Sequence, residues 1–233
     1  MKKYLFTIFL TIVWLGHAAA QKVIYTDDFT QGLRNWIIEK VSEKTVLQTK
    51  DSALEVIAPD GITLWYKNPV VSPVKIVFDA KVVGGGSEND RVSDLNCFWM
   101  ASDPEHPDSL FARSEWRNGV FGRYYSLSLY YAGYGGNNNS TTRFRKYDGN
   151  YQQFAGRNLR PEILMEYTDS AHLIIPNKWY HIEIIVNGNR IQYFMNNELL
   201  FDYYDKNPYS GGYFGLRAVK NHIIYKGFKI IQL

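Results

Sequence analysis

The feature that most constrains the fold is a run of alternating apolar and polar residues between positions 179 and 204. Ile182, Ile184 and Val186 share one face of an extended segment, and polar residues occupy the other face. Asn187-Gly188 then supplies a strong hairpin turn signal, and two more short strand-like segments follow it. This stretch predicts a three-stranded antiparallel meander.

Most of the remaining chain also consists of short strand-like segments separated by turn clusters, with no convincing long helix. Strands at this spacing are typical of an all-β fold, either a two-sheet sandwich or a barrel. Besides the meander, the segments expected to form strands are 46–58, 62–66, 74–83, 95–100, 124–131, 213–219 and 223–233.

The two ends of the chain fit one another. Residues 23–29 can pair at a sheet edge with the final segment, 227–233, and Trp36 then belongs to the turn after the first strand. This pairing predicts an antiparallel jelly-roll sandwich. Residues 84–86 are the best candidate for a domain boundary, but strands of the same type lie on both sides. We therefore expect a single jelly-roll domain over residues 21–233.

Residues 1–20 have the features of a cleavable signal peptide. Lys2 and Lys3 precede an apolar run, and small residues at 18–20 suit cleavage. The apolar run is too short to span a membrane, so we expect a periplasmic or extracellular protein without a transmembrane anchor. Removing the two lysines lowers the formal charge from +3 to +1, which gives no support for nucleic-acid binding.

The aromatic content is high, at 16% of the residues. Aromatic residues favour strands and supply rings for stacking on flat ligands. Cys97 is the only cysteine, so no intrachain disulfide forms, and its apolar neighbours predict a buried structural thiol. The histidines lack the spacing of a zinc site, and we predict no metal ligands and no cofactor.

Chemistry-bearing side chains are densest between positions 116 and 149, which we expect to form a long functional loop region beginning near Arg117. Arg143 and Arg145 are two apart, so both point to one face of an extended segment while Phe144 points to the other. Two guanidinium groups on one face suit a carboxylate or a sulfate. The alternative is a solvated strand with Phe144 in the core.

Asp94 and Asn96 also share a face, together with Phe98, just before Trp99. They can place a carboxylate and an amide at the bottom of a cleft, with Asp94 as an acid or base if apolar neighbours raise its pKa. The alternative is a strand-end turn in which Asp94 caps residues 91–93.

His222 is the best of the four mature histidines as a proton-transfer group, because it stands near Arg217 at an expected turn. Residues 133–136 are rich in glycine and precede Asn137, but no helix follows, so we reject a nucleotide-binding loop. These glycines instead allow a ligand or a neighbouring strand to approach the backbone.

Several segments resemble the concanavalin A-like lectin and glucanase superfamily. They are 27–29 with Trp36, the strand 93–99, and the meander that opens at Trp179. The chain is similar to a family of secreted Bacteroides-type, sugar-hydrolase-like proteins of largely unassigned function, which accompany genes for using rhamnogalacturonan and other plant glycans. The most specific segments are 130–137, 141–149, 214–217 and 221–222.

The resemblance implies a jelly roll with a ligand on its concave sheet, and often cleavage of glycosidic bonds. The glucanase signature Glu-x-Asp-x-x-Glu is missing, which argues against a retaining hydrolase. The superfamily also contains uronate lyases, in which Arg and Asn neutralise a carboxylate and His or Tyr moves the proton.

The sequence therefore predicts an exported carbohydrate-active protein that cleaves an acidic plant-type polysaccharide or oligosaccharide. In a lyase His222 or Tyr134 is the base, and in a hydrolase Asp94 is the acid. The expected substrate-binding residues are Arg143, Arg145, Arg217, Asn96, Asn137, Arg117 and Trp99.

Two other readings stay open, a carbohydrate-binding module without catalysis and a scaffold protein of the cell envelope. A structural calcium at Asp27 or Asp28 also stays open, since the spacing of these residues is too loose to predict one.

Overall fold

The computed structural model describes residues 21–157 and 159–233. The expected signal peptide, residues 1–20, lies outside the described residues. The strands are β1 (Lys22–Asp27), β2 (Trp36–Lys40), β3 (Val46–Lys50), β4 (Ala53–Tyr66), β5 (Val70–Val71), β6 (Val74–Val82), β7 (Leu95–Ser102), β8 (Ser128–Gly135), β9 (Thr141–Asp148), β10 (Ile163–Tyr167), β11 (Trp179–Asn187), β12 (Arg190–Met195), β13 (Glu198–Tyr204) and β14 (Gly211–Gln232). The helices are short: α1 (Ser114–Arg117), α2 (Gly136–Asn139), α3 (Tyr151–Phe154), η1 (Leu110–Arg113), η2 (Phe121–Ser126) and η3 (Ser170–His172).

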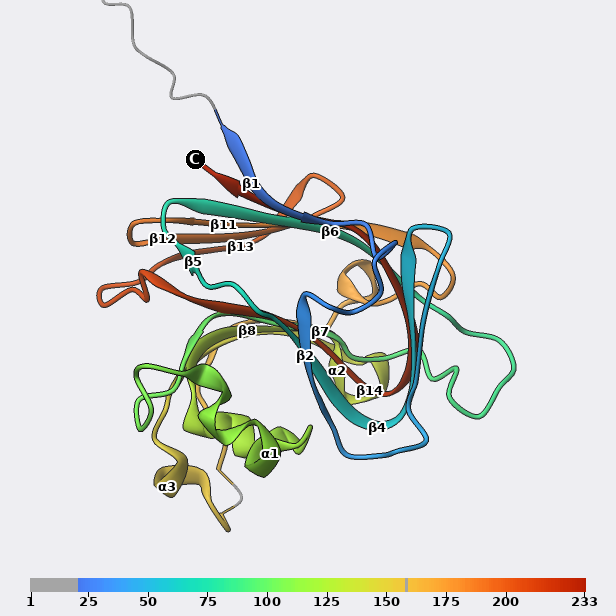
Figure 1. The fold of residues 1–233 in the computed structure, drawn as a ribbon, viewed down its shortest axis with the longest axis horizontal. Helices are drawn as coiled ribbons and strands as arrows, with labels where there is room; N and C mark the ends of the chain where they lie inside the picture. Colours follow the sequence, from blue (N-terminus) through green and yellow to red (C-terminus); the bar gives the residue numbers. More distant parts are fainter. Residues whose placement is uncertain (1–20, 158) are drawn as a thin grey trace, which may run out of the picture.

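The strands form two antiparallel layers, so the predicted β-sandwich is confirmed (Figure 1). One layer contains β6, β11, β12 and β13, and the other contains β7, β8, β9 and β10. The long strand β14 joins them, because its first half pairs with β7 and its second half pairs with β6. β4 runs beside β14 through both halves.

β14 corrects one prediction. The segments 213–219 and 223–233 are a single strand, in which the register shifts between Val219 and Asn221 instead of turning back. A second shift falls between Lys226 and Lys229, around Gly227, whose φ is +64°. Glycine tolerates this left-handed conformation at little cost, and the strand can therefore bend across both layers.

The chain ends behave as predicted. β1 pairs with the end of β14, from Lys22 opposite Gln232 to Asp27 opposite Phe228. Trp36 does not lie in a turn. It begins β2 and is buried at 3% exposure, where its ring packs 5.1 Å from that of Phe228.

The meander is also confirmed: β11, β12 and β13 pair in order. Ile182, Ile184 and Val186 are all fully buried between the layers. Two other boundaries were wrong. The segment 46–58 is a hairpin that turns at residues 51–52, which have positive φ, and residues 124–126 belong to η2, not to a strand.

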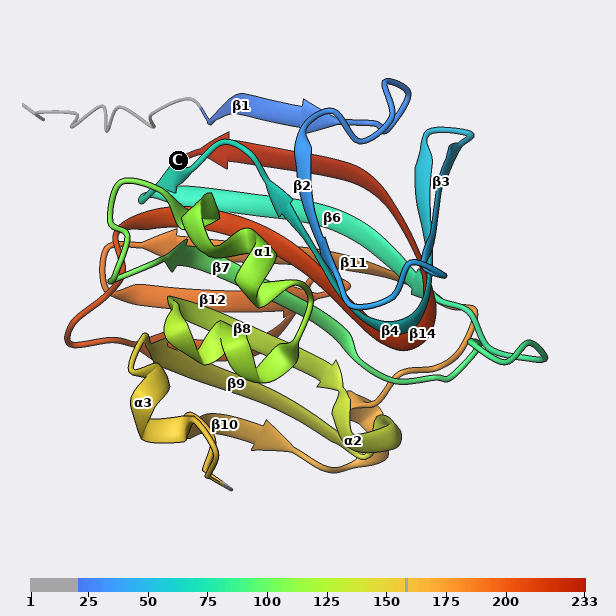
Figure 2. The same ribbon diagram turned by 60° about the horizontal axis from the view of Figure 1, so that its bottom comes forward.

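The outer face of the β7–β9 layer carries a second group of packed aromatic residues. Trp65, Phe98, Tyr131 and Tyr147 lie on this face beneath Tyr124 of η2. The short helices α1 and α3 lie on the same side of the layer, away from the other sheet (Figure 2). They form a cover that leaves part of the face open. No helix among the described residues is long and apolar enough to cross a membrane.

Candidate functional site

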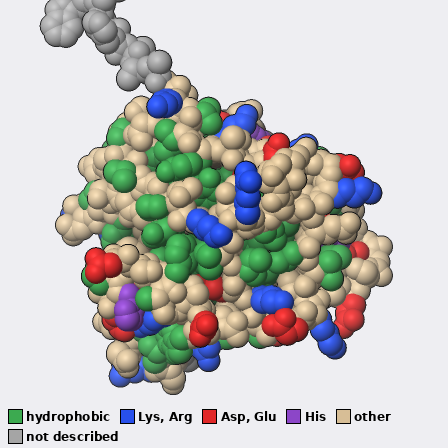
Figure 3. Space-filling model, viewed as in Figure 1, with side chains coloured by type: hydrophobic (Ala, Val, Ile, Leu, Met, Phe, Trp, Pro, Cys, Tyr) green, Lys and Arg blue, Asp and Glu red, His purple; other side chains and the backbone are tan. Residues whose placement is uncertain are grey.

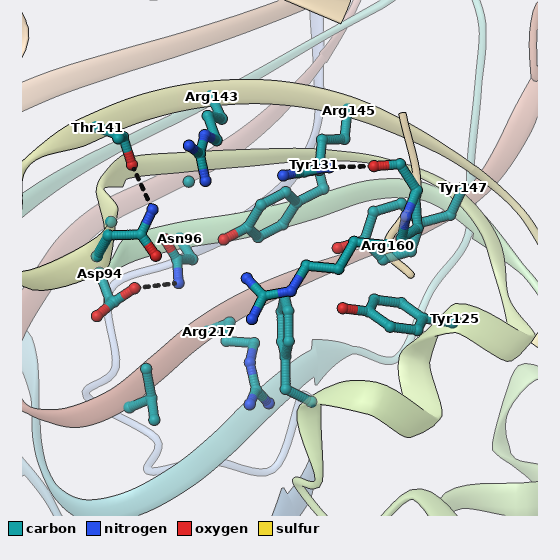
Figure 4. Close-up of a pocket in the computed structure, with 16 residues that line it drawn as sticks. Asp94, Asn96, Tyr125, Tyr131, Thr141, Arg143, Arg145, Tyr147, Arg160 and Arg217 are labelled. Carbon is teal, nitrogen blue, oxygen red and sulfur yellow. Dashed lines mark hydrogen bonds between the residues drawn. The ribbon is translucent and has the colours of Figure 1, made fainter. Parts of the chain in front are cut away.

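A pocket of about 230 Å³ opens on this outer face, between the strands and η2 (Figure 4). We call it the arginine pocket. Strand alternation brings side chains of β7, β8, β9 and β14 to one surface, and η2 and residues 160–161 complete the wall. Its lining residues are Asp94, Asn96, Phe121, Tyr125, Tyr131, Gly133, Gly136, Asn137, Thr141, Arg143, Arg145, Tyr147, Arg160, Pro161, Arg217 and Val219.

Arg143 and Arg145 both face the pocket, and Phe144 is fully buried between the layers, as the alternation predicted. Arg143 donates through Nε to Glu166, the residue opposite it on β10. Arg145 is only 8% exposed and donates to the carbonyl of Pro161. Burial lowers the pKa of Arg145, because the charged form loses its hydration.

Arg217 lies at the bottom of the pocket and is 1% exposed. Its Nη1 donates to Thr63 Oγ1 at 2.9 Å and to the carbonyl of Gly119 at 3.0 Å. Its guanidinium carbon lies 5.0 Å from the ring centroids of both Phe121 and Tyr124. Nε has no hydrogen-bond partner. A buried guanidinium with only neutral partners favours an anion from outside.

Close backbone packing makes room for this arginine. A Cβ on Gly61 would lie 2.4 Å from the Gly119 carbonyl oxygen and 2.8 Å from Arg217 Nη2. Any other residue at position 61 would therefore clash with the Gly119 carbonyl and with the Arg217 guanidinium.

Three tyrosines, Tyr125, Tyr131 and Tyr147, also line the pocket. In Figure 4 the Tyr131 hydroxyl points toward Asn96. Burial raises the pKa of each, and nearby arginines oppose the shift, so all three hydroxyls are neutral donors at neutral pH. The Tyr131 hydroxyl lies over Gly133, where a Cβ would approach it to 2.4 Å.

Asp94 is the only carboxylate among the described residues of the lining. It faces the pocket, and it also accepts hydrogen bonds from Arg91 Nη2 at 2.5 Å and Ser93 Oγ at 2.6 Å. Asn96 is 3% exposed and its Oδ1 has no partner. Asn137 donates to Thr141 Oγ1 at 3.1 Å on the pocket rim.

The charges of the pocket do not balance. Four arginines line it against Asp94, which is already paired with Arg91. Within the described chain, no carboxylate lies within ion-pair distance of Arg145, Arg160 or Arg217. On the face drawn in Figure 3, basic and acidic side chains are interspersed. Such a lining can attract an anionic group.

Other predicted site residues lie elsewhere. Trp99 is fully buried between the layers, 5.7 Å from the ring of Phe144, so its expected contact with a substrate is corrected. Tyr134 points to the opposite side of β8 and donates to the Leu173 carbonyl at 3.1 Å. Arg117 is buried in an ion pair with Glu39 at 2.8 Å, outside the pocket lining.

His222 also lies outside the pocket lining, which corrects its predicted role in proton transfer beside Arg217. It belongs to β14, beyond the register shift, and not to a turn. Its Nδ1 lies 3.0 Å from Asp90 Oδ1 and its Nε2 lies 2.8 Å from Glu55 Oε1. Both ring nitrogens are therefore engaged in holding neighbouring segments together.

Sequence reasoning missed eight lining residues, which are Phe121, Tyr125, Tyr131, Thr141, Tyr147, Arg160, Pro161 and Val219. Period-two alternation from Arg145 points to Tyr147, and that signal was present. Predicting Tyr131 requires knowing that it lies opposite Arg145 on the neighbouring strand, and no local pattern gives that pairing. Tyr125 and Arg160 come from irregular segments without periodicity.

The two residues considered for calcium accept hydrogen bonds from neighbouring groups of the chain. Asp27 accepts hydrogen bonds from the Phe29 amide at 2.8 Å and from Trp36 Nε1 at 2.9 Å. Asp28 accepts from the Thr30 hydroxyl at 2.6 Å. In the part of the chain that the structure describes, no three His, Cys, Asp or Glu side chains group to hold a metal. These aspartates close the first turn.

No curated protein matches the chain. Among solved structures, a protein of unknown function with a galectin-like fold from Bacillus subtilis gives a TM-score of 0.68 at 15% identity, covering 91% of this chain and 98% of that one. The carbohydrate-binding module CBM66 from Bacillus subtilis gives 0.54 at 13% identity, covering 84% and 94%.

The endo-β-1,3-glucanase of Pyrococcus furiosus gives a TM-score of 0.55 at 10% identity, covering 91% of this chain and 94% of that one. At such low identities the likeness shows the fold alone, and it confirms the predicted concanavalin A-like jelly roll. A family model described as Domain of unknown function (DUF6250) matches residues 56–228, most of the chain, and the protein therefore belongs to that family.

Proposed function

We propose that the protein is an exported carbohydrate-active protein that binds a uronate-type sugar unit in the arginine pocket and cleaves the adjoining glycosidic bond by elimination. The observation that carries the proposal is the convergence of four arginines and three tyrosines on a pocket with one, already paired, carboxylate. The use of plant-type glycans, implied by the sequence resemblance, belongs to the same proposal.

The carboxylate of the sugar is the group that the arginines select. Arg145 and Arg217 have no carboxylate partner in the described chain, and the unpaired Asn96 Oδ1 is free to accept a hydrogen bond from a sugar hydroxyl. Guanidinium groups bind carboxylates through paired, charge-assisted hydrogen bonds. Neutralising a uronate carboxylate makes the hydrogen on the adjacent carbon more acidic, which is the first requirement of elimination.

Elimination fits the lining better than hydrolysis does. Glycoside hydrolysis ordinarily needs two carboxyl groups flanking the bond, and Asp94 is the only one among the described lining residues. Elimination breaks the C–H bond beside the carboxylate and the next carbon's bond to the glycosidic oxygen, forming a carbon–carbon double bond between them. We assign both proton transfers to Tyr131, whose deprotonated oxygen takes the proton from carbon and then returns it to the departing sugar oxygen. Burial and the nearby Asp94 raise the pKa of the Tyr131 hydroxyl, and Arg217 and Arg145 only partly oppose that rise.

A second candidate is binding without cleavage. Burial raises the pKa of all three pocket tyrosines, which keeps them protonated and favours a site that holds its ligand unchanged. The two candidates share the same ligand and differ only in turnover.

The test is incubation of the purified protein with a panel of uronate-bearing and neutral oligosaccharides, followed by mass spectrometry and ultraviolet absorbance. We expect fragments that carry a carbon–carbon double bond, made by the wild type but not by Tyr131→Phe. The matched control is Tyr204→Phe, at an exposed tyrosine outside the pocket lining. Thermal stabilisation by acidic sugars without any fragment supports the binding protein, and no response to acidic sugars overturns both candidates.

A further inference from the structure

A second pocket, of about 510 Å³, adjoins the arginine pocket. We call it the edge pocket. The two share Arg160 and Pro161 as lining residues. The edge pocket is lined by Lys146, Asp148, Gln153, Phe154, Arg160, Pro161, Glu162, Leu164, Tyr203, Asp205 and Tyr209.

The sheet topology explains the position of the edge pocket. β10 pairs with β9 only from Tyr167 opposite Thr142 to Ile163 opposite Arg145. Residues 146–148 of β9 therefore have no β10 partner, and the edge of the layer stays open beside them. The far wall comes from the other layer, where β13 ends at Tyr204.

Carboxylates are in excess in the edge pocket, whereas arginines are in excess in the arginine pocket. Lys146 is neutralised by Asp205 at 2.7 Å, and its ammonium also lies 4.5 Å from the ring centroid of Tyr209. Asp148 and Glu162 are exposed, and neither forms an ion pair with another described residue. Three carboxylates thus face one paired lysine and the shared Arg160.

The uncharged lining suits a polyol. Tyr203, Tyr209, Phe154 and Leu164 present ring and apolar surface. Sugars pack their C–H faces on such surface, while carboxylates and amides accept hydrogen bonds from their hydroxyls. A second anionic sugar here would be repelled by Asp148 and Glu162.

We propose that the edge pocket binds a neutral sugar unit next to the acidic unit held in the arginine pocket. This inference rests on the proposed function and names its substrate class, a heteropolysaccharide in which an acidic unit adjoins a neutral one. Homopolymers of uronate are then poor ligands, because their second unit meets the two unpaired carboxylates.

Calorimetric titration tests this inference. The ligands are a tetrasaccharide of galacturonate, tetrasaccharides in which a uronate alternates with a neutral sugar, and a single methyl galacturonide. Tyr131→Phe serves as the background, so that no cleavage occurs during titration. We expect the background protein to bind at least one alternating tetrasaccharide about tenfold more tightly than the galacturonate tetrasaccharide.

Two added substitutions locate the preference. Asp148→Asn with Glu162→Gln removes both charges at nearly constant shape, and we expect the preference to fall to within about twofold because charge-assisted hydrogen bonds and repulsion are both lost. The matched control is Glu88→Gln with Glu198→Gln, two exposed carboxylates that line neither of the two pockets. The control pair should keep the full preference.

Equal affinity of the background protein for all tetrasaccharides would overturn the inference, and so would an undiminished preference in the Asp148 and Glu162 variant. In either case the proposed function would still hold if the protein binds methyl galacturonide and Arg145→Gln weakens that binding. Binding of no acidic ligand at all would overturn both.

Discussion

Two buried arginines show how the same residue type serves two purposes in one fold. Arg117 is fully buried and pairs with Glu39 at 2.8 Å, while its Nη2 also donates to the Leu110 carbonyl at 2.7 Å. Arg217 is 1% exposed and has only Thr63, a carbonyl and two aromatic rings as partners. Tyr124 lies between them, because its hydroxyl donates to Glu39 and its ring packs on Arg217.

The difference concerns where the counter-charge comes from. Arg117 has its anion within the chain, so its ion pair is complete on folding and fixes the helical cover against β2. Arg217 is desolvated without an anion, which costs free energy that its neutral partners offset in part and that a bound anion would offset further. We infer that the first arginine contributes to stability and the second to recognition.

The largest expected effect is on stability, at Arg117. Arg117→Met leaves Glu39 buried without its cation, so the free energy of unfolding should fall by about 3–5 kcal/mol. Denaturant unfolding measures this change. A loss below about 1 kcal/mol would show that the buried pair contributes little, and would remove one side of the comparison.

Arg217→Met should have the opposite signature. We expect at least about a 30-fold loss of affinity for acidic sugars, because the bound carboxylate loses its deepest cation. Removing a charge without a counter-ion offsets the hydrogen bonds lost to Thr63 and Gly119, so stability should change by less than about 1 kcal/mol. Titration calorimetry and denaturant unfolding of the same variant measure the two effects. Strong destabilisation with unchanged affinity would show that Arg217, like Arg117, contributes to stability and not to recognition.

Tyr131→Phe sharpens the assignment of the pocket. The variant keeps the ring that packs 5.5 Å from Phe98 and removes only the hydroxyl. Affinity for an acidic sugar should fall about five- to tenfold, the usual effect of one hydrogen bond, with little change in melting temperature. Affinity equal to that of the wild type would mean that the Tyr131 hydroxyl does not contact the ligand.

An exposed arginine pair gives the smallest effect. Arg190 Nη2 lies 2.7 Å from Asp202 Oδ2, and the hydrogen bond from Arg190 lowers the pKa of Asp202. A lowered folded pKa means that this stabilisation is present above the ordinary pKa of 3.8 and is lost as pH falls through the lowered value. Asp202→Asn should therefore reduce the melting temperature slightly at pH 7, and less at low pH or in high salt. A change as large as that of Arg117→Met would contradict the contrast between exposed and buried pairs.

The candidate site shows how far local pattern extends. Alternation identified Arg143 and Arg145 on one face and Phe144 on the other, since a strand fixes side-chain direction within two residues. The same rule could not say that Trp99 faces the core, because its face depends on which side of the layer the second sheet covers. His222 and Arg217 are close in sequence, yet they lie on either side of the register shift in β14, and only Arg217 lines the pocket.

The sequence by itself determined most of the strand segments, the meander, the pairing of the chain ends and the shared face of Arg143 and Arg145, because these depend on alternation and turn chemistry over a few residues. Only the tertiary structure decided which arginine meets a carboxylate. Glu39 lies 78 positions from Arg117, and Thr63 lies 154 positions from Arg217. Electrostatic partners are set by the packing of distant segments, and no local pattern carries that information.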